Sequence, residues 1–277
     1  MVVVVALAIL AVRTAHAEQC PLIPGGTASW DGNQASELLR DGQFSQVEAT
    51  LEKQHQKNLA SEGEDLLTLR NVTELLQLSD QEENLVRMWA DQRPQSFFAQ
   101  FSAGVFYANR ASDARGQHFI SQTSSSQLTD MRKLDKTATA YLQKAMQLDP
   151  RSALPQGILL NIAAMEGQAA GKSAEQWLQA ANQVDPKNLA ARIQAANHLS
   201  PRWGGSFELL DQMVQQAEKS LPAQSAYYLR YNVVLAKASH EEVITGNKSQ
   251  AQALYKSAKS MCENSSVARD GIIRTYQ

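Results

Sequence analysis

The chain contains 277 residues with 26 Lys or Arg and 28 Asp or Glu, which gives a formal net charge of −2. A protein that binds nucleic acid through many phosphate contacts needs an excess of positive charge, so this balance excludes a strongly basic nucleic-acid binder. Hydrophobic residues make up 43% and charged residues 19%, as in globular proteins, while aromatic residues make up only 6%. The many alanine, leucine and glutamine residues favour helices over strands.

The N-terminus, MVVVVALAILAVRTAHAEQC, is an apolar run followed by the small-x-small pattern Ala15-His16-Ala17. The run is too short to cross a bilayer as a helix and has the length typical of a signal peptide. A signal peptide usually carries Lys or Arg before this run, and here there is none; four successive valines also suit a buried strand. Because no other strand-like segment exists for pairing, the sequence predicts a signal peptide at 1–17 and an extended segment at 18–33. The mature protein is expected to be periplasmic or secreted, without stable membrane insertion.

The chain has two cysteines, Cys20 and Cys262. In an oxidising compartment they could form a disulfide that ties the mature N-terminus to a late helix, or they could remain two unpaired thiols. The sequence does not give the distance between them, so both alternatives stay open.

Residues 34–277 predict a single all-helical repeat domain. Apolar residues recur at three- and four-residue spacing in successive segments, as on the buried face of a helix. A helical hairpin is expected around Gly42, and further apolar helical faces are expected from Leu66 to Leu78 and from Phe97 to Phe106. The composition of residues 121–130, SQTSSSQLTD, predicts a loop.

The clearest internal repeat lies within residues 137–222, where YLQKAMQLDPRS begins at Tyr141 and WLQAANQVDPKN begins at Trp177. In each copy the aromatic residue and a small alanine share one helical face, so that a neighbouring helix can approach closely. The Asp-Pro pair is expected to end one helix and start the next. A helical pair cannot bury its apolar face alone, so the fold class predicted is all-α, an α-α superhelix or solenoid of helical hairpins.

The segment SPRWGGSFELL, at 200–210, combines turn residues with the start of an apolar helical pattern. Ser206 is expected to cap that helix, the two glycines before it allow positive φ, and Trp203 can fold back onto the helix it precedes. The alternative is capture of an anion by exposed N–H groups, with Arg202 adding charge. The segment is mainly expected to be a structural corner.

The repeat resembles a tetratricopeptide repeat. The order of segments from Leu38 to Ala217 resembles a bacterial family, domain of unknown function 4034. The most specific matching pieces are the spacing of Trp89, Pro94 and Ser96, the pair Arg115-Gly116, and Arg202-Trp203-Gly204-Gly205-Ser206. The resemblance implies a fold rather than an activity.

No zinc, phosphate-loop, dinucleotide or nucleophile-elbow motif occurs, so the sequence predicts no catalytic, cofactor-binding or metal-binding residues and no cofactor. The expected function is non-enzymatic binding of another protein, with Arg115, Arg202 and Trp203 as candidate contact residues. A specific version is an immunity protein against a toxin that acts in the periplasm. Two alternatives are an enzyme with a helical pocket that includes these residues or His118, and a structural component of an envelope assembly.

Overall fold

The computed structural model describes residues 32–60, 65–76, 83–116 and 120–276. Within these ranges the chain forms thirteen α-helices and no strands, which confirms the predicted all-α class. The α-helices are α2 (Gly32–Arg40), α3 (Phe44–Ala60), α4 (Asp65–Leu75), α5 (Glu83–Gln92), α6 (Phe97–Arg115), α7 (Ser125–Leu148), α8 (Leu154–Glu166), α9 (Ala174–Val184), α10 (Ala190–His198), α11 (Phe207–Ala217), α12 (Ala223–His240), α13 (Lys248–Met261) and α14 (Ser266–Tyr276). Short 3-10 turns occur at η2 (Ile120–Gln122) and η3 (Pro201–Trp203), and a π-helical turn occurs at η4 (Glu241–Thr245).

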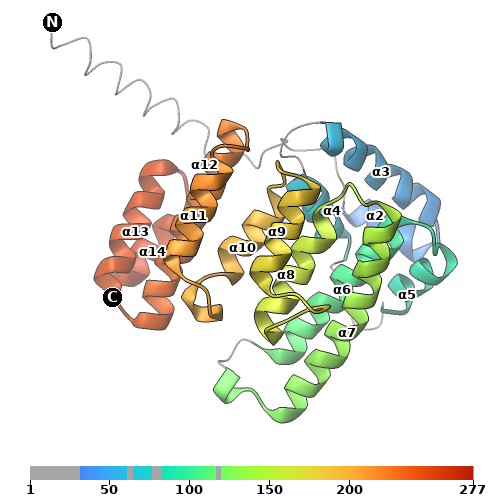
Figure 1. Cartoon of the computed structure of the whole chain (residues 1–277), viewed down its shortest axis with the longest axis horizontal. Coiled ribbons are helices and arrows are strands. Elements are labelled where there is room, and N and C mark those ends of the chain that lie inside the picture. The colour runs from blue at the N-terminus through green and yellow to red at the C-terminus, as the bar shows by residue number, and fades with distance from the viewer. Residues whose placement is uncertain (1–31, 61–64, 77–82, 117–119, 277) are drawn as a thin grey trace, which may run out of the picture.

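The helices lie side by side and follow one another across the molecule, from α5 and α6 to α13 and α14 (Figure 1). The most extensive packing is between α6 and α7, and α8 packs against both of them as well as against α9 and α10. In the same way α10 packs against α12, and α12 packs against α13. The even-numbered helices α6, α8, α10 and α12 therefore form consecutive contacts through the middle of the protein.

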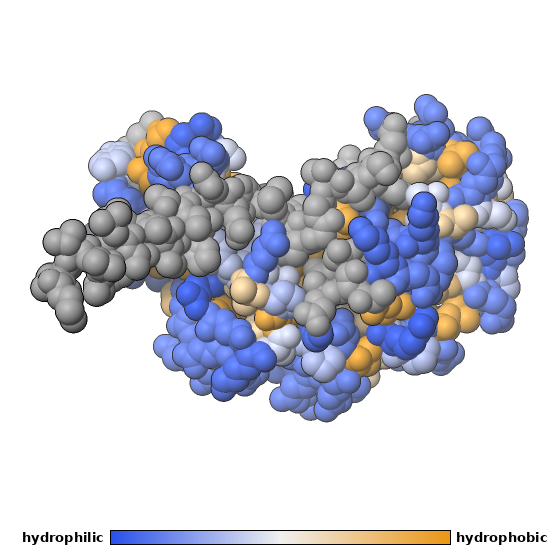
Figure 2. All heavy atoms as spheres, turned by 90° about the horizontal axis from the view of Figure 1, so that it is seen from above, coloured by the Kyte–Doolittle hydropathy of each residue, from blue (hydrophilic) through white to orange (hydrophobic). Residues whose placement is uncertain are grey.

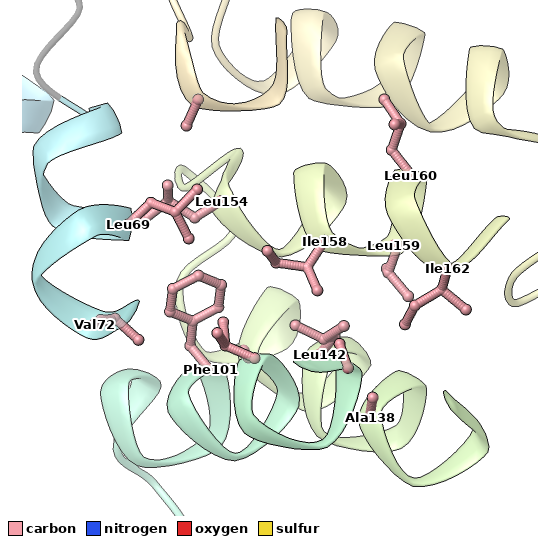
Figure 3. Close-up of a cluster of buried hydrophobic side chains, with 14 of the residues drawn as sticks. Leu69, Val72, Phe101, Ala138, Leu142, Leu154, Ile158, Leu159, Leu160 and Ile162 are labelled. Atoms are coloured by element: carbon pink, nitrogen blue, oxygen red, sulfur yellow. The ribbon is translucent and has the colours of Figure 1, made fainter. Parts of the chain in front are cut away.

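The main core fills the space between α4, α6, α7 and α8 (Figure 3). Leu69 and Val72 of α4 and Phe101 of α6 meet Leu142 of α7 and Ile158 of α8, all almost fully buried. Burial of each such side chain contributes about 1.5–3 kcal/mol relative to exposure, so this cluster is a principal source of stability. A smaller cluster, which includes Tyr231, Ala258 and Cys262, joins α12, α13 and the start of α14.

The first two described helices, α2 and α3, form the expected helical hairpin, with Gly42 at φ +69° between them. The loop predicted at 121–130 is wrong, because α7 begins at Ser125. Ser124 and Gln127 form a capping box, in which the Ser124 side chain accepts the Gln127 N–H and the Gln127 side chain accepts the Ser124 N–H. The serine-rich composition thus reflects a helix start rather than a loop.

The two sequence copies end their helices in the same way. The backbone N–H of Asp149 donates to Ala145 at the end of α7, and that of Asp185 donates to Ala181 at the end of α9. Each aspartate carboxylate also accepts the N–H two residues later, at distances of 3.1 Å and 2.8 Å. The prolines do not start the following helices as expected, because α8 begins only at Leu154.

Where Figure 2 colours the described residues, hydrophilic side chains predominate and apolar side chains appear as separate patches. In the described ranges, no helix combines the length and the apolar character that crossing a bilayer requires. The predicted signal peptide at 1–17 and most of the segment at 18–33 lie outside the described residues.

Candidate functional site

The turn between α10 and α11 has a backbone conformation that requires glycine at two positions. Gly204 adopts the left-handed conformation at φ +86°, which favours glycine. A Cβ at Gly205 would lie 1.9 Å from the carbonyl oxygen of Leu199, so only glycine fits there. The Ser206 hydroxyl accepts the N–H of Leu209 at 3.1 Å and caps α11, as predicted. The segment is therefore a tightly specified corner.

Trp203 lies on this corner with two guanidinium groups beside its ring. The Cζ atom of Arg115, at the end of α6, is 5.1 Å from the ring centroid, and that of Arg202 is 5.3 Å from it. His198, at the end of α10, packs against the same ring with centroids 5.7 Å apart. The expected packing of Trp203 onto the following helix is not the main contact, because its ring neighbours come from the ends of α6 and α10. The structure thus brings together the three predicted contact residues, and we call Arg115, His198, Arg202 and Trp203 the Trp203 cluster.

Arg115 is a buried cation, with only 8% of its surface exposed. Its Nη1 donates to the Gly116 carbonyl at 3.1 Å. Burial lowers the pKa of Arg115, and the positive charge of Arg202 lowers it further. No Asp or Glu in the described ranges forms an ion pair with Arg115. Two like charges therefore lie beside one aromatic ring.

His198 is neutral in this environment, because burial lowers its pKa. Its Nδ1 lies 3.1 Å from the Gln194 carbonyl oxygen. A carbonyl can only accept a hydrogen bond, so Nδ1 carries the proton and Nε2 carries the lone pair.

A cavity of about 310 Å³ adjoins Arg202 and Trp203 and extends to α12, η4 and α14. Its polar lining residues include Asn197 and Ser200 before η3 and Asn232 on α12. Its apolar lining residues are Leu235 and Ala236 on α12, Val243 and Ile244 on η4, and Val267 on α14. Ser239 and His240 complete the lining, and the Nδ1 atom of His240 is buried without a hydrogen-bond partner. The cavity is therefore amphipathic.

Sequence reasoning did not identify His198, Asn232 or His240 as members of this region. His198 lies one short turn before Trp203, which was a usable signal, whereas Asn232 and His240 arrive only through the packing of α12 on α10. His118, the other predicted pocket residue, lies outside the described residues.

A second, larger cavity of about 750 Å³ lies between the first half of α3, the segment from the end of α5 to the start of α6, and the end of α7. Its charged lining residues are Glu48, Glu52, Arg93, Asp149 and Arg151. Behind it the buried His55 donates from Nε2 to the Asp149 carboxylate at 3.2 Å and stacks on Phe97. Asp149 is thus more than the helix cap expected from the repeat.

The His55–Asp149 pair resembles half of a catalytic triad, but its surroundings do not complete one. Burial lowers the pKa of His55, against the opposing effect of Asp149, and its Nδ1 has no partner. No Ser, Thr or Cys side chain in the described ranges donates a hydrogen bond to this imidazole. The pair joins α3 to the turn after α7.

The structure describes one of the two cysteines, Cys262. Cys262 is buried, ends α13 and is disulfide-bonded. Cys20 lies outside the described residues, so the pairing of the two stays a prediction.

The fold and the Trp203 cluster define an all-α protein in which a partly buried cationic and aromatic cluster lies beside a cavity with polar and apolar lining residues. Residues 33–170 match the family model described as a domain of unknown function (DUF4034), which supports the family resemblance drawn from the sequence. Arg115 lies inside the matched range, whereas Arg202 and Trp203 lie beyond it. The chain matches none of the curated proteins and none of the solved structures.

Proposed function

We propose that the chain is a non-enzymatic helical-repeat protein, exported to the periplasm or secreted, that binds another protein. The observation that carries the proposal is the Trp203 cluster, in which side chains from the ends of α6 and α10 meet beside an open cavity. Trp and Arg are the residue types that dominate binding energy in protein interfaces. An exposed Arg and a half-buried Trp next to a cavity suit such a contact.

The arrangement of helices supports a solenoid of tetratricopeptide-like hairpins as the scaffold. Each of α6, α8 and α10 contacts the helix that follows it and the next helix but one, as stacked hairpins do. The alanines of the two sequence copies, Ala145 and Ala181, are fully buried, and so is Ala217 at the end of α11. A stack of this kind presents the loops of successive hairpins along one edge, where a partner can make several contacts.

The proposed compartment is supported by the apolar run and the Ala15-His16-Ala17 pattern of the sequence. A narrower form of the proposal is an immunity protein that neutralises a toxin acting in the periplasm. It is an analogy from compartment and scaffold. A constitutive envelope component is the alternative among binding functions, and it would give an oligomer in solution.

An enzyme is the second candidate, because one observation favours it. His198 is a neutral imidazole with a lowered pKa, next to Trp203 and near the 310 Å³ cavity. However, catalysis needs a nucleophile or a polarised substrate group within hydrogen-bond reach of the base. No nucleophilic side chain forms a hydrogen bond with His198 in the part of the chain that the structure describes.

Affinity capture from periplasmic extract, followed by calorimetry with the purified captured protein, tests the proposal. We expect one partner with micromolar affinity or better. The Arg202→Glu variant should weaken its binding at least roughly tenfold, since the substitution reverses a charge in the cluster. Arg87→Glu is the matched control, because Arg87 is exposed on α5 and donates to Asn84. Failure to capture a protein, together with substrate turnover that His198→Ala abolishes, would replace this proposal with the enzyme.

A further inference from the structure

We infer that a third cavity, lined by α5, α6 and α7, binds a short acidic peptide that has a free amino group and two carboxylates. This cavity has a volume of about 550 Å³, which lies within the range of small-molecule sites. It shares no lining residue with the cavity beside Trp203. The inference therefore goes beyond the proposed function and concerns a second ligand.

Two lysines of α7 supply positive charge to this cavity. Lys136 and Lys144 line it together with Ala140, and the three residues follow one face of the helix at four-residue spacing. No Asp or Glu in the described ranges forms an ion pair with either lysine. Their Cα atoms are about 12 Å apart along the helix. Because each ammonium group lies on a flexible four-carbon side chain, both can reach one small ligand.

The lining also contains hydrogen-bond acceptors, which a simple anion would leave unused. Gln100 of α6 is 2% exposed, and its Nε2 donates to the Ala90 carbonyl at 2.9 Å. No described residue donates a hydrogen bond to its Oε1. Asp91 of α5 lines the same cavity, and its carboxylate forms no ion pair within the described ranges. A ligand that carries N–H groups, as a peptide does, can donate to both acceptors.

Tyr141 of α7 adds a hydroxyl group to the lining. Its ring stacks on that of Tyr107 with centroids 5.8 Å apart, and the Tyr107 hydroxyl donates to Glu83 at 2.9 Å. Burial and the negative charge of Asp91 raise the pKa of Tyr141, so its hydroxyl keeps its proton at neutral pH. No described residue forms a hydrogen bond with this hydroxyl, which can therefore donate to a carboxylate of the ligand.

The charges of the lining determine which ligand is complementary. The lining holds two ammonium groups, of Lys136 and Lys144, and one carboxylate, of Asp91. A tripeptide with one acidic side chain and free termini carries the opposite set, two carboxylates and one ammonium group. Each charge of such a peptide finds a partner in the cavity, and charge-assisted hydrogen bonds of this kind are strong. Alanine and proline side chains also line the cavity and leave room for the peptide backbone.

The test is isothermal titration of the full chain at pH 7 with four ligands. Ala-Glu-Ala with free termini carries the complementary charges. Ala-Gln-Ala lacks the side-chain carboxylate, acetyl-Ala-Glu-Ala lacks the ammonium group, and adipate is a dicarboxylate without N–H groups. Ala-Glu-Ala should bind with a Kd between roughly 10 µM and 1 mM. Ala-Gln-Ala and adipate should bind roughly tenfold or more weakly, and the acetylated peptide several-fold more weakly.

Four variants tie the binding to this cavity. Lys136→Gln and Lys144→Gln should each weaken binding of Ala-Glu-Ala roughly tenfold. Lys259→Gln is the matched control and should leave it unchanged, because Lys259 is exposed on α13 and does not line the cavity. Asp91→Asn should weaken Ala-Glu-Ala but not its acetylated form, since only the former has an ammonium group. Circular dichroism checks that each variant remains folded.

Three results would overturn the inference. They are absence of binding by Ala-Glu-Ala, equal affinity for Ala-Gln-Ala or adipate, and unchanged binding by both lysine variants. Equal weakening of the free and acetylated peptides by Asp91→Asn would also contradict it. The protein-binding proposal is tested separately, because Arg202→Glu changes the other cavity and the captured partner is a different ligand.

Discussion

At the scale of single residues, Asp135 on α7 is a carboxyl group buried in the core without hydrogen-bond partners. Its side chain is 1% exposed, and neither carboxylate oxygen has a hydrogen-bond partner. Burial raises its pKa to about 7, with a further contribution from the negative charge of Glu166. A carboxyl group that folds preferentially in its protonated form makes stability depend on pH.

We predict that the free energy of unfolding falls between about pH 4 and about pH 7 because of Asp135. In this window the folded state binds the proton more tightly than the unfolded state, so ionisation destabilises the fold. The full effect is at most roughly 4 kcal/mol. Urea unfolding of Asp135→Asn against the wild type at pH 4.5 and 8 checks this, because the variant should be relatively more stable at pH 8. An equal stability difference at both pH values would show that Asp135 does not titrate between them.

Gly205 provides a second test at this scale. Gly205→Ala should lower the free energy of unfolding by roughly 2 kcal/mol or more, because its Cβ would overlap the Leu199 carbonyl. The comparison is Gly42→Ala, where the backbone is left-handed at φ +69° but no atom lies within 4 Å of the added Cβ, so that substitution costs only the strain of the left-handed backbone. Denaturant midpoints measure both. An equal loss of unfolding free energy for the two substitutions would show that the close approach at Gly205 does not affect stability.

At the scale of elements, apolar spacing predicted the helices because one buried face determines both the periodicity and the packing. Leu39 and Val47 of the first hairpin and Phe101 of α6 are buried as that spacing requires. The failure at 121–130 came from weighting serine content over the Ser124-x-x-Gln127 pattern, which was present in the sequence. The Asp-Pro pattern predicted where α7 and α9 end. It did not predict the contact of Asp149 with His55, because that contact depends on tertiary packing.

The capping box gives a prediction for α7. Ser124→Ala should lower the free energy of unfolding by about 1 kcal/mol, because the Gln127 N–H loses its side-chain acceptor. Ser125→Ala, at the first position of the helix, should change stability by only a few tenths of a kcal/mol. Thermal or urea unfolding compares them. A larger loss for Ser125 would contradict the assigned start of α7.

At the scale of the whole molecule, the candidate site could be predicted in its members but not in its geometry. Arg202 and Trp203 attracted notice by their turn sequence and Arg115 by family resemblance. Their meeting at one ring depends on how α6 and α10 end at the same edge, which no local pattern encodes. The cavity also requires α12, η4 and α14, because these elements supply its apolar lining residues.

A disulfide between Cys20 and Cys262 would act at this scale as well, because the two residues lie near opposite ends of the sequence. We predict that they pair and that Cys262→Ser lowers the free energy of unfolding by roughly 2–5 kcal/mol. Peptide mass mapping under non-reducing conditions should recover one cross-linked peptide containing both residues. Two alkylated thiols in exported, unreduced protein would contradict the pairing.

Hydrogen–deuterium exchange on the complex with the captured partner tests most directly whether the Trp203 cluster is a protein-binding site. Binding should slow exchange in residues 197–206 and 232–244, where η3, the end of α12 and η4 surround the cavity. Exchange in α5, on the far side of the molecule, should remain unchanged (Figure 1). Protection confined to α5 and the neighbouring helices, with none at 197–206, would contradict the assignment of this edge as the binding surface.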